Sequence, residues 1–378
     1  MADILTAPPV PSDSAPEAIL QEPLWKIRLR LTRRSVAANW RLFVANKIGI
    51  IGLGMIGVFA LMAISHPILM STVWDPAVYN PITGYHAVKV DKLVVAVVND
   101  PTTEVDLSTA RIQSNPFIEV GDTLSIPQQP APPSLGVRAG TDRNGVEVSA
   151  SHILGTDPLG RDILSQLLYS TRAAFFLGMI AAVVTVFIAT AIGSISAYFG
   201  GWIDTVLMRF ADLILLVPLL PVLIVVSGLF RISLPLLGLL IGLLGGFGGT
   251  AIILKSQALQ VSVKPFIDAA RIAGGGHAHL IFRHIVPNVL PLSFLYMMFT
   301  VTEAISLEAI LSFLGLLSIP MSWGIMINVA QTQGYFLSGT DYWWLLIPAG
   351  LAVSLLCASF FLVGRAMDEV VNPRLRQR

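Results

Sequence analysis

Six long apolar runs constrain the fold of this chain more than any other feature. They cover residues 48–70, 173–198, 206–230, 232–254, 289–317 and 343–363. A helix needs roughly 20 mostly apolar residues to cross a hydrocarbon core of about 30 Å, where lipid offers the backbone no hydrogen bonds. The composition, 54% hydrophobic and 12% charged residues, agrees with lipid as the main solvent. We therefore expect an all-α integral membrane fold with six transmembrane helices.

The basic residues predict how these runs are oriented, because Lys and Arg near span ends resist translocation. With the N-terminus inside, most of them fall on the cytoplasmic side, and the short outer connections carry only Arg231. The long outer segment has more acidic than basic residues. We expect both termini in the cytoplasm.

The runs also predict the organisation of the chain. Residues 1–47 are expected to form a cytoplasmic segment with a disordered lead and a basic interfacial stretch, followed by the first span at 48–70. An extracytoplasmic loop at 71–171 precedes a core at 172–366, which holds five spans and a cytoplasmic loop at 255–288; a tail covers 367–378. The outer loop is long for an unstructured connection. Its stretches KLVVAVV, PFIEVGDTLSI and GVEVSAS predict short β-strands.

The cytoplasmic loop contains the sequence KPFIDAARIAGGG, which predicts a short helix over 265–273. Pro265 suits the first helical turn, Asp268 complements the helix dipole, and the glycines from Gly274 onward stop the helix. The small Ala269 and Ala270 leave a face that another protein can approach closely. The helix is thus a candidate docking element, and the alternative is an amphipathic helix lying on the membrane.

The spacing around this helix resembles a known motif. Asp-Ala-Ala, three residues, Gly, nine residues and His-Ile-Val-Pro is similar to the coupling motif of bacterial ABC importer permeases. That motif usually reads Glu-Ala-Ala with Gly and Ile-x-Leu-Pro, so Asp268, His284 and Val286 depart from it. The resemblance assigns ATPase coupling to Asp268, Ala269, Ala270, Gly274, His284 and Pro287.

Further segments resemble the second permease subunit of the dipeptide, oligopeptide and nickel type, from about residue 40 to 376. They are HILGTDPLGRDILSQLLYSTR, MRFADLILLVP, LEAILSFLGLLSIPMSWGIMI and NPRLR, in that order. The resemblance implies the fold of a type I importer permease in a bacterial or archaeal plasma membrane. It implies import of peptides, with oligosaccharides or nickel as alternatives.

The same resemblance implies the partners. They are a homologous permease subunit, two ATP-binding subunits that hold ATP and Mg, and an extracytoplasmic binding protein, so the chain itself is expected to have no cofactor and no catalytic residue. The segment at 79–132 is longer than the family pattern. We hypothesise that it contacts the binding protein, the alternative being a passive elaboration, and deletion of residues 82–129 with transport and binding-protein affinity measured would decide.

Charged residues within the apolar runs are candidates for the pathway, because an ionised side chain in lipid normally faces a partner or water. Glu303 and Glu308 are five residues apart and about 140° apart around a helix, so they do not share a face. Lining the substrate pathway, pairing with Arg and contact with the partner subunit all remain open for them. Arg209 and Asp212 have the spacing of an interfacial ion pair on one helix face.

Other features favour structural interpretations. His277, His279 and His284 lack an accompanying carboxylate, which argues against a metal site. The glycines of GLLGGFGGT indicate close helix packing, since no Gly-Lys-Ser/Thr phosphate loop exists in the chain. Pro218, Pro221 and Pro235 are expected to kink or end spans, and Cys357, the only cysteine, is expected to pack.

Two rival classes are less compatible with the sequence. An ion-coupled secondary transporter would need its own coupling groups in the membrane, and only Glu303 and Glu308 qualify. A membrane enzyme or receptor that uses the outer loop would need a nucleophile, base or metal constellation there, and none is convincing.

Overall fold

The computed structural model describes residues 40–82, 133, 135–141, 147–337 and 340–371. The helices are α3 (Lys47–Thr72), α4 (Pro76–Tyr79), α5 (Ile163–Phe199), α6 (Gly201–Leu216), α7 (Leu219–Leu229), α8 (Leu234–Phe247), α9 (Gly249–Ser262), α10 (Pro265–Ile272), α11 (His277–Leu280), α12 (Val286–Phe313), α13 (Trp323–Thr332) and α14 (Trp343–Val371). A π-helical turn at Ile281–Ile285 joins α11 to α12, and a 3₁₀ turn at Tyr335–Leu337 follows α13.

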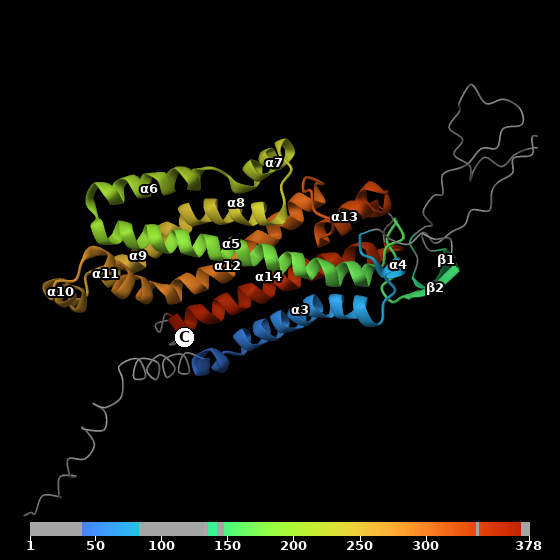
Figure 1. The fold of residues 1–378 in the computed structure, drawn as a ribbon, viewed down its shortest axis with the longest axis horizontal. Coiled ribbons are helices and arrows are strands. Elements are labelled where there is room, and N and C mark those ends of the chain that lie inside the picture. Colours follow the sequence, from blue (N-terminus) through green and yellow to red (C-terminus); the bar gives the residue numbers. More distant parts are fainter. Residues whose placement is uncertain (1–39, 83–132, 134, 142–146, 338–339, 372–378) are drawn as a thin grey trace, which may run out of the picture.

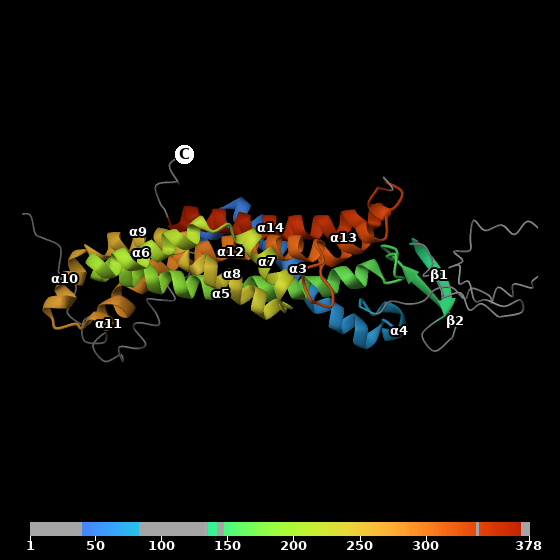
Figure 2. The ribbon, with the colours of Figure 1, turned by 90° about the horizontal axis from the view of Figure 1, so that it is seen from above.

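These helices form an elongated bundle (Figures 1 and 2). The long α5 runs through its middle and packs against α8, α9, α12 and α3, while α14 lies between α3 and α12. The short helices α10 and α11 lie at one end of the bundle and strands β1 and β2 at the other (Figure 1). The expected all-α membrane fold is confirmed.

The number of spans depends on two broken helices. Within the described residues, α3, α5, α14 and the continuous helix His277–Phe313 are each long and apolar enough to cross a membrane. The predicted third span is instead α6 and α7, bent by 75°, and the predicted fourth is α8 and α9, bent by 45°. Six spans result when each bent pair counts as one, which agrees with the six transmembrane helices expected from the sequence and with the expectation that prolines kink or end spans.

Local chemistry explains where the helices begin. The Asn46 side chain accepts hydrogen bonds from Ile48 N and Gly49 N at the start of α3, and Asp162 accepts from Ser165 N at the start of α5. Such caps satisfy backbone donors that have no partner within the helix. α5 therefore begins nine residues before the expected core boundary at 172.

The prolines act as the sequence predicts. Pro218 is the N-cap of α7, Pro221 lies in the first turn of α7, and Pro235 lies in the first turn of α8. Proline lacks a backbone N–H and disfavours a helical conformation in the residue before it. The break between α6 and α7 accordingly falls at Val217, whose backbone is extended (ψ 116°).

The glycine-rich stretch packs α8 closely against α5. A Cβ added to Gly242 would lie 2.6 Å from Val184 Cβ, and one added to Gly246 would lie 2.9 Å from Ile188 Cβ. Gly238 meets Ile180 in the same way. Small residues four apart let two backbones approach, which confirms the packing interpretation of these glycines.

The outer loop is described only in part. β1 (Gly136–Thr141) and β2 (Glu147–His152) pair antiparallel, with Gly136 opposite His152 and Thr141 opposite Glu147. β2 confirms the strand predicted for GVEVSAS, whereas β1 had no prediction. The other two predicted strands, and most of the segment at 79–132, lie outside the described residues.

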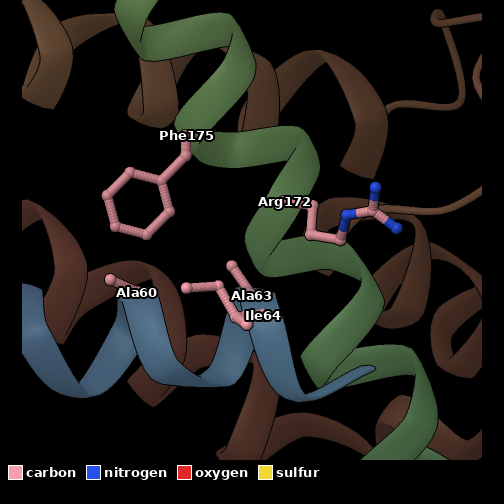
Figure 3. Close-up of a pocket in the computed structure, with 5 residues that line it drawn as sticks. All are labelled: Ala60, Ala63, Ile64, Arg172 and Phe175. Carbon is pink, nitrogen blue, oxygen red and sulfur yellow. The ribbon is translucent and has the colours of Figure 1, made fainter. Parts of the chain in front are cut away.

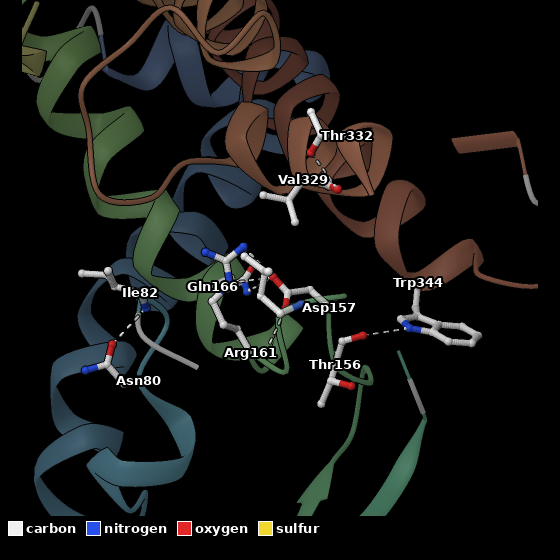
Figure 4. A network of polar contacts seen from close by, with 10 residues as sticks. Asn80, Ile82, Thr156, Asp157, Arg161, Gln166, Val329, Thr332 and Trp344 are labelled. Atoms are coloured by element: carbon white, nitrogen blue, oxygen red, sulfur yellow. Dashed lines mark hydrogen bonds and ion pairs between the residues drawn. The ribbon is translucent and has the colours of Figure 1, made fainter. Parts of the chain in front are cut away.

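A polar network closes the end of the bundle next to these strands (Figure 4). Arg161 Nε donates to Asp157 Oδ2 at 2.6 Å, and Gln166 Nε2 donates to the same oxygen at 2.9 Å. Trp344 Nε1 of α14 donates to the carbonyl of Thr156 at 3.2 Å. The segment TDPLGRD thus ties the start of α5 to α14, which gives a structural reason for its polar residues.

Candidate functional site

The short helix α10 projects at the end of the bundle opposite the strands (Figure 1). Its start and stop are those expected for 265–273: Pro265 lies in the first turn, and Ala273 is the C-cap. Gly275 N donates to Ala270 O and Gly274 N to Arg271 O, both at 3.0 Å. This double hydrogen bond is the Schellman arrangement that ends many helices.

The glycine turn after α10 needs glycine at two positions for different reasons. Gly274 has φ +85°, which side chains rarely adopt, and nothing lies within 4 Å of a Cβ added there. A Cβ on Gly275 would lie 2.7 Å from the Ala270 carbonyl oxygen. The turn is therefore fixed in shape and open to an approaching partner.

One side chain anchors α10 to the bundle. Ile267 is fully buried and belongs to an apolar cluster formed with α5, α9 and the start of α12. Burying such a side chain contributes about 1.5–3 kcal/mol. Ile267 was not among the residues predicted from the sequence, although a second large apolar residue beside Phe266 in a short loop helix was a signal.

Four large apolar side chains in and around α10 are exposed. Val263, Phe266, Ile272 and Phe282 are exposed, Ile272 by 88%. We call these four residues the apolar rim. Large apolar side chains that remain exposed outside the membrane spans are candidates for contact with another protein. The rim was not predicted, but large apolar residues in a loop expected in the cytoplasm were a visible signal.

The residues assigned to coupling lie close to this rim. Asp268 is exposed and pairs with Arg271 at 3.4 Å, Ala269 is exposed and Ala270 is half-buried. His284 lies in the π-helical turn, with its ring centroid 6.3 Å from that of Phe266. Pro287, in the first turn of α12, is exposed. The structure thus places Asp268, Ala269, Ala270 and Gly274 on one helix and turn, and brings His284 against its first turn.

The three histidines of this loop have other neighbours. His277 Nδ1 lies 2.8 Å from Tyr198 Oη, whereas the rings of His279 and His284 are 5.3 Å apart. Within the described residues, no group of three or more His, Cys, Asp or Glu side chains is arranged to hold a metal ion. Their visible role is packing and hydrogen bonding around the glycine turn.

The two acidic residues of α12 differ in environment. Glu308 is buried, 3% exposed, and accepts a hydrogen bond from Ser312 Oγ at 2.5 Å. Glu303 is exposed and makes no hydrogen bond or ion pair with the residues that the structure describes. Glu303 is therefore the better placed of the two to meet water or another subunit.

Two further polar predictions can be placed. Arg209 and Asp212 approach to 3.8 Å on the exposed surface of α6, which confirms the ion pair on one helix face. Cys357 packs at the α12–α14 contact, with its Sγ 3.5 Å from Ser306 Oγ. The expected packing role of the cysteine is confirmed.

Two shallow hollows border α5 nearer the strand end. One, of about 330 Å³, lies between α3 and α5 and is lined by Ala60, Ala63, Ile64, Arg172 and Phe175 (Figure 3). The other, of about 400 Å³, also includes Arg172 and reaches Pro320 and Met321. Their linings are mainly apolar, so neither offers an assembled catalytic constellation.

Long apolar helices, two broken spans and a short exposed helix at one end are the architecture expected of a membrane transport permease. The chain belongs to the family of binding-protein-dependent transport system inner membrane components, whose sequence pattern matches residues 189–377. It is accordingly a multi-pass inner membrane protein and a permease subunit of an ABC importer, a class that works with a separate ATPase and a binding protein.

Several relatives are similar to this chain over most of their own length. The dipeptide transport system permease protein DppC of Bacillus subtilis is 32% identical, over 65% of this chain and 76% of the relative. The oligopeptide transport system permease protein OppC of the same organism is 35% identical, over 61% and 74%. OppC of Mycobacterium bovis is 34% identical, over 60% and 77%.

Proposed function

We propose that this permease subunit imports dipeptides or oligopeptides into the cytoplasm. The observation that carries the proposal is its similarity, at 32–35% identity, to permeases named for dipeptide and oligopeptide transport, over about three quarters of their length. The bundle adds two broken spans, α6–α7 and α8–α9. Such breaks are tolerated in a membrane where the freed backbone groups meet protein or water, as along a pathway.

In this proposal the chain pairs with a homologous permease subunit, two ATPase subunits dock on the α10 end, and the binding protein docks on the strand end. ATP and its magnesium ion are held by the ATPase subunits. Both termini and the loop at 255–288 then lie in the cytoplasm. The start of α3 and the end of α14 support this, because both helix ends lie toward the α10 end of the bundle (Figure 1). They are joined there by a hydrogen bond from Asn46 Nδ2 to Glu369 Oε2 at 2.5 Å.

The α10 geometry supports a mechanical role for the coupling residues. The apolar rim and the glycine turn offer a docking surface to the ATPase, while Ile267 anchors α10 in the bundle. Movement of the docked ATPase is thereby applied to the ends of α9 and α12. Nucleotide biases an equilibrium between inward-open and outward-open states by contacting the two states differently.

Gly274→Asp tests the docking surface. We expect the variant to lose co-purification with the ATPase subunits, because its side chain would stand in open space on the docking turn and carry a charge. Gly334→Asp is the matched control, since Gly334 has φ +83° and is equally open but follows α13 at the other end of the bundle. Normal ATPase recovery and transport with Gly274→Asp would refute this docking site.

Accessibility of single cysteines tests the orientation. In a Cys357→Ala background, Ala269→Cys should react only with a membrane-permeant maleimide in intact cells. Gln333→Cys, exposed beyond α13, should react with an impermeant one. The reverse labelling pattern would invert the proposed topology.

The substrate is tested in proteoliposomes that contain the two permease subunits, the ATPases, the binding protein and internal ATP. We expect uptake of labelled dipeptides or oligopeptides. Uptake of nickel or an oligosaccharide, with no uptake of peptide, would keep the permease assignment and overturn the peptide assignment.

A further inference from the structure

Tyr198, near the end of α5, is held between the two sides of the glycine turn. Its Oη lies 2.8 Å from Nδ1 of His277, the first residue of α11. The guanidinium carbon of Arg271, in the last turn of α10, lies 6.0 Å from the centre of the Tyr198 ring. One aromatic side chain of α5 therefore contacts the chain both before and after the turn at Gly274.

Along the chain, Tyr198 lies just before the turn that leads from α5 into α6. Gly200 and Gly201, with φ +62° and +53°, form the turn between α5 and α6. Just beyond this turn, Asp204 of α6 pairs with Lys255 Nζ of α9 at 2.5 Å and accepts a hydrogen bond from Ser196 Oγ of α5. A displacement of Tyr198 thus reaches the base of α6 through the short glycine turn and this polar contact.

The Tyr198–His277 contact is poorly suited to a role in stability alone. It is exposed, and a hydrogen bond of this kind contributes only about 0.5–1.5 kcal/mol. Ile267 already anchors α10 by full burial. The contact is, however, directional, and it joins the glycine turn directly to α5. Ile267 meets α5 through non-directional apolar packing.

We propose that Tyr198 and His277 are positioning residues that transmit movement of the glycine turn to the α5–α6 turn. This inference rests on the proposed function, in which an ATPase moves α10. It adds α6 to the helices driven by the ATPase, along a connection separate from the continuous helix that leads into α12.

The experiment measures two quantities in the reconstituted transporter: recovery of the ATPase subunits with the permease, and ATP hydrolysed per substrate molecule imported. Tyr198→Phe removes the hydroxyl and keeps the ring, and His277→Ala removes its partner. We expect each to leave ATPase recovery unchanged and to raise the ATP cost per substrate by about threefold to tenfold. The double variant should be no worse than either single one.

Two further variants separate transmission from general destabilisation. His277→Asn places an amide atom where Nδ1 stands, so it should restore coupling to near the wild-type ratio. Tyr335→Phe removes a tyrosine hydroxyl at the opposite end of the bundle and should leave the ratio unchanged. A variant that merely unfolds would lower the yield of complex without changing this ratio.

The outcomes distinguish this inference from the proposed function. An unchanged ratio in Tyr198→Phe, with ATPases still bound, overturns the inference and leaves the docking site intact. Additive effects in the double variant would also overturn it, because the residues would then act independently. Loss of ATPase recovery in Tyr198→Phe would make Tyr198 a docking residue, whereas an unaffected Gly274→Asp variant would instead contradict the proposed docking site.

Discussion

Different physical constraints act on single residues at different positions of this chain: available space, backbone conformation or the pairing of charges. Gly242 is required because a neighbouring helix occupies the volume of a side chain, whereas Gly274 is required by its backbone angle in open space. Asp204 and Lys255 form a half-buried pair that joins two helices, whereas Arg209 and Asp212 pair loosely on an exposed surface. Substitution of the same residue type is therefore expected to have different effects at different positions.

Gly242→Ala should destabilise the bundle by about 1–3 kcal/mol, because a Cβ would lie 2.6 Å from Val184 Cβ and 3.0 Å from the Ala181 carbonyl oxygen. Gly57→Ala on α3 is the control, since a Cβ there meets nothing within 4 Å. Thermal unfolding of the purified chain in detergent should show a lower Tm for the first variant alone. Equal Tm values would mean that α8 can shift away from α5 without cost.

Removing the charge of Lys255 should also lower stability. Lys255→Met leaves the half-buried Asp204 without its cation, and the expected loss is about 1–3 kcal/mol, between the values for exposed and buried pairs. Arg209→Met breaks the exposed pair and should change the free energy of unfolding by less than about 1 kcal/mol. Similar losses of unfolding free energy in both variants would show that the Asp204–Lys255 pair stabilises the fold no more than the exposed pair does.

At the scale of the elements, the bundle departs from straight spans where backbone hydrogen bonding is interrupted. The α6–α7 break follows from Pro218, which fixes the extended conformation of Val217. The α8–α9 bend falls at Gly248, whose φ of −87° and ψ of −134° are not helical. The exposed α10 is fixed by a proline at its start and two glycines at its end.

Pro218→Ala should reduce the 75° bend between α6 and α7, because Val217 could then adopt a helical conformation. Spin labels at residues 202 and 229, both exposed, should move apart in a pulsed electron–electron distance measurement. Pro221→Ala is the control, since proline in the first turn of α7 is compatible with the helix. An unchanged distance in Pro218→Ala would show that tertiary packing, and not proline, sets the bend.

At the scale of the whole molecule, the bundle has two chemically different ends. One end presents α10 with the apolar rim, and the other holds the buried polar network around Asp157 together with β1 and β2 (Figure 2). Long helices, with α5 spanning 37 residues, connect these ends through the region between them. Such a molecule can transmit a movement from one end to the other, but it needs partners to drive the movement.

The purified chain alone in liposomes should therefore transport no substrate under an ion gradient. Addition of the partner permease, ATPases, binding protein and ATP should start uptake, and ATP withdrawal should stop it. Ion-driven uptake by the chain alone would instead favour a secondary transporter that uses Glu303.

The sequence alone determined the membrane class, the positions of the spans and the short helix at 265–273. Each of these follows from local patterns: apolar length, proline at a helix start and glycine at its end. The family resemblance added the roles expected for Asp268, Ala269, Ala270 and Gly274.

Only the tertiary structure decided how these parts meet. The burial of Ile267, the exposure of the apolar rim and the Tyr198–His277 contact depend on residues far apart in sequence. The same holds for Glu303 and Glu308: helical periodicity placed them on different faces, but the packing of neighbouring helices decided that Glu308 is covered. Local patterns specify which helices form, whereas burial is a property of the neighbours that each helix acquires when the bundle assembles.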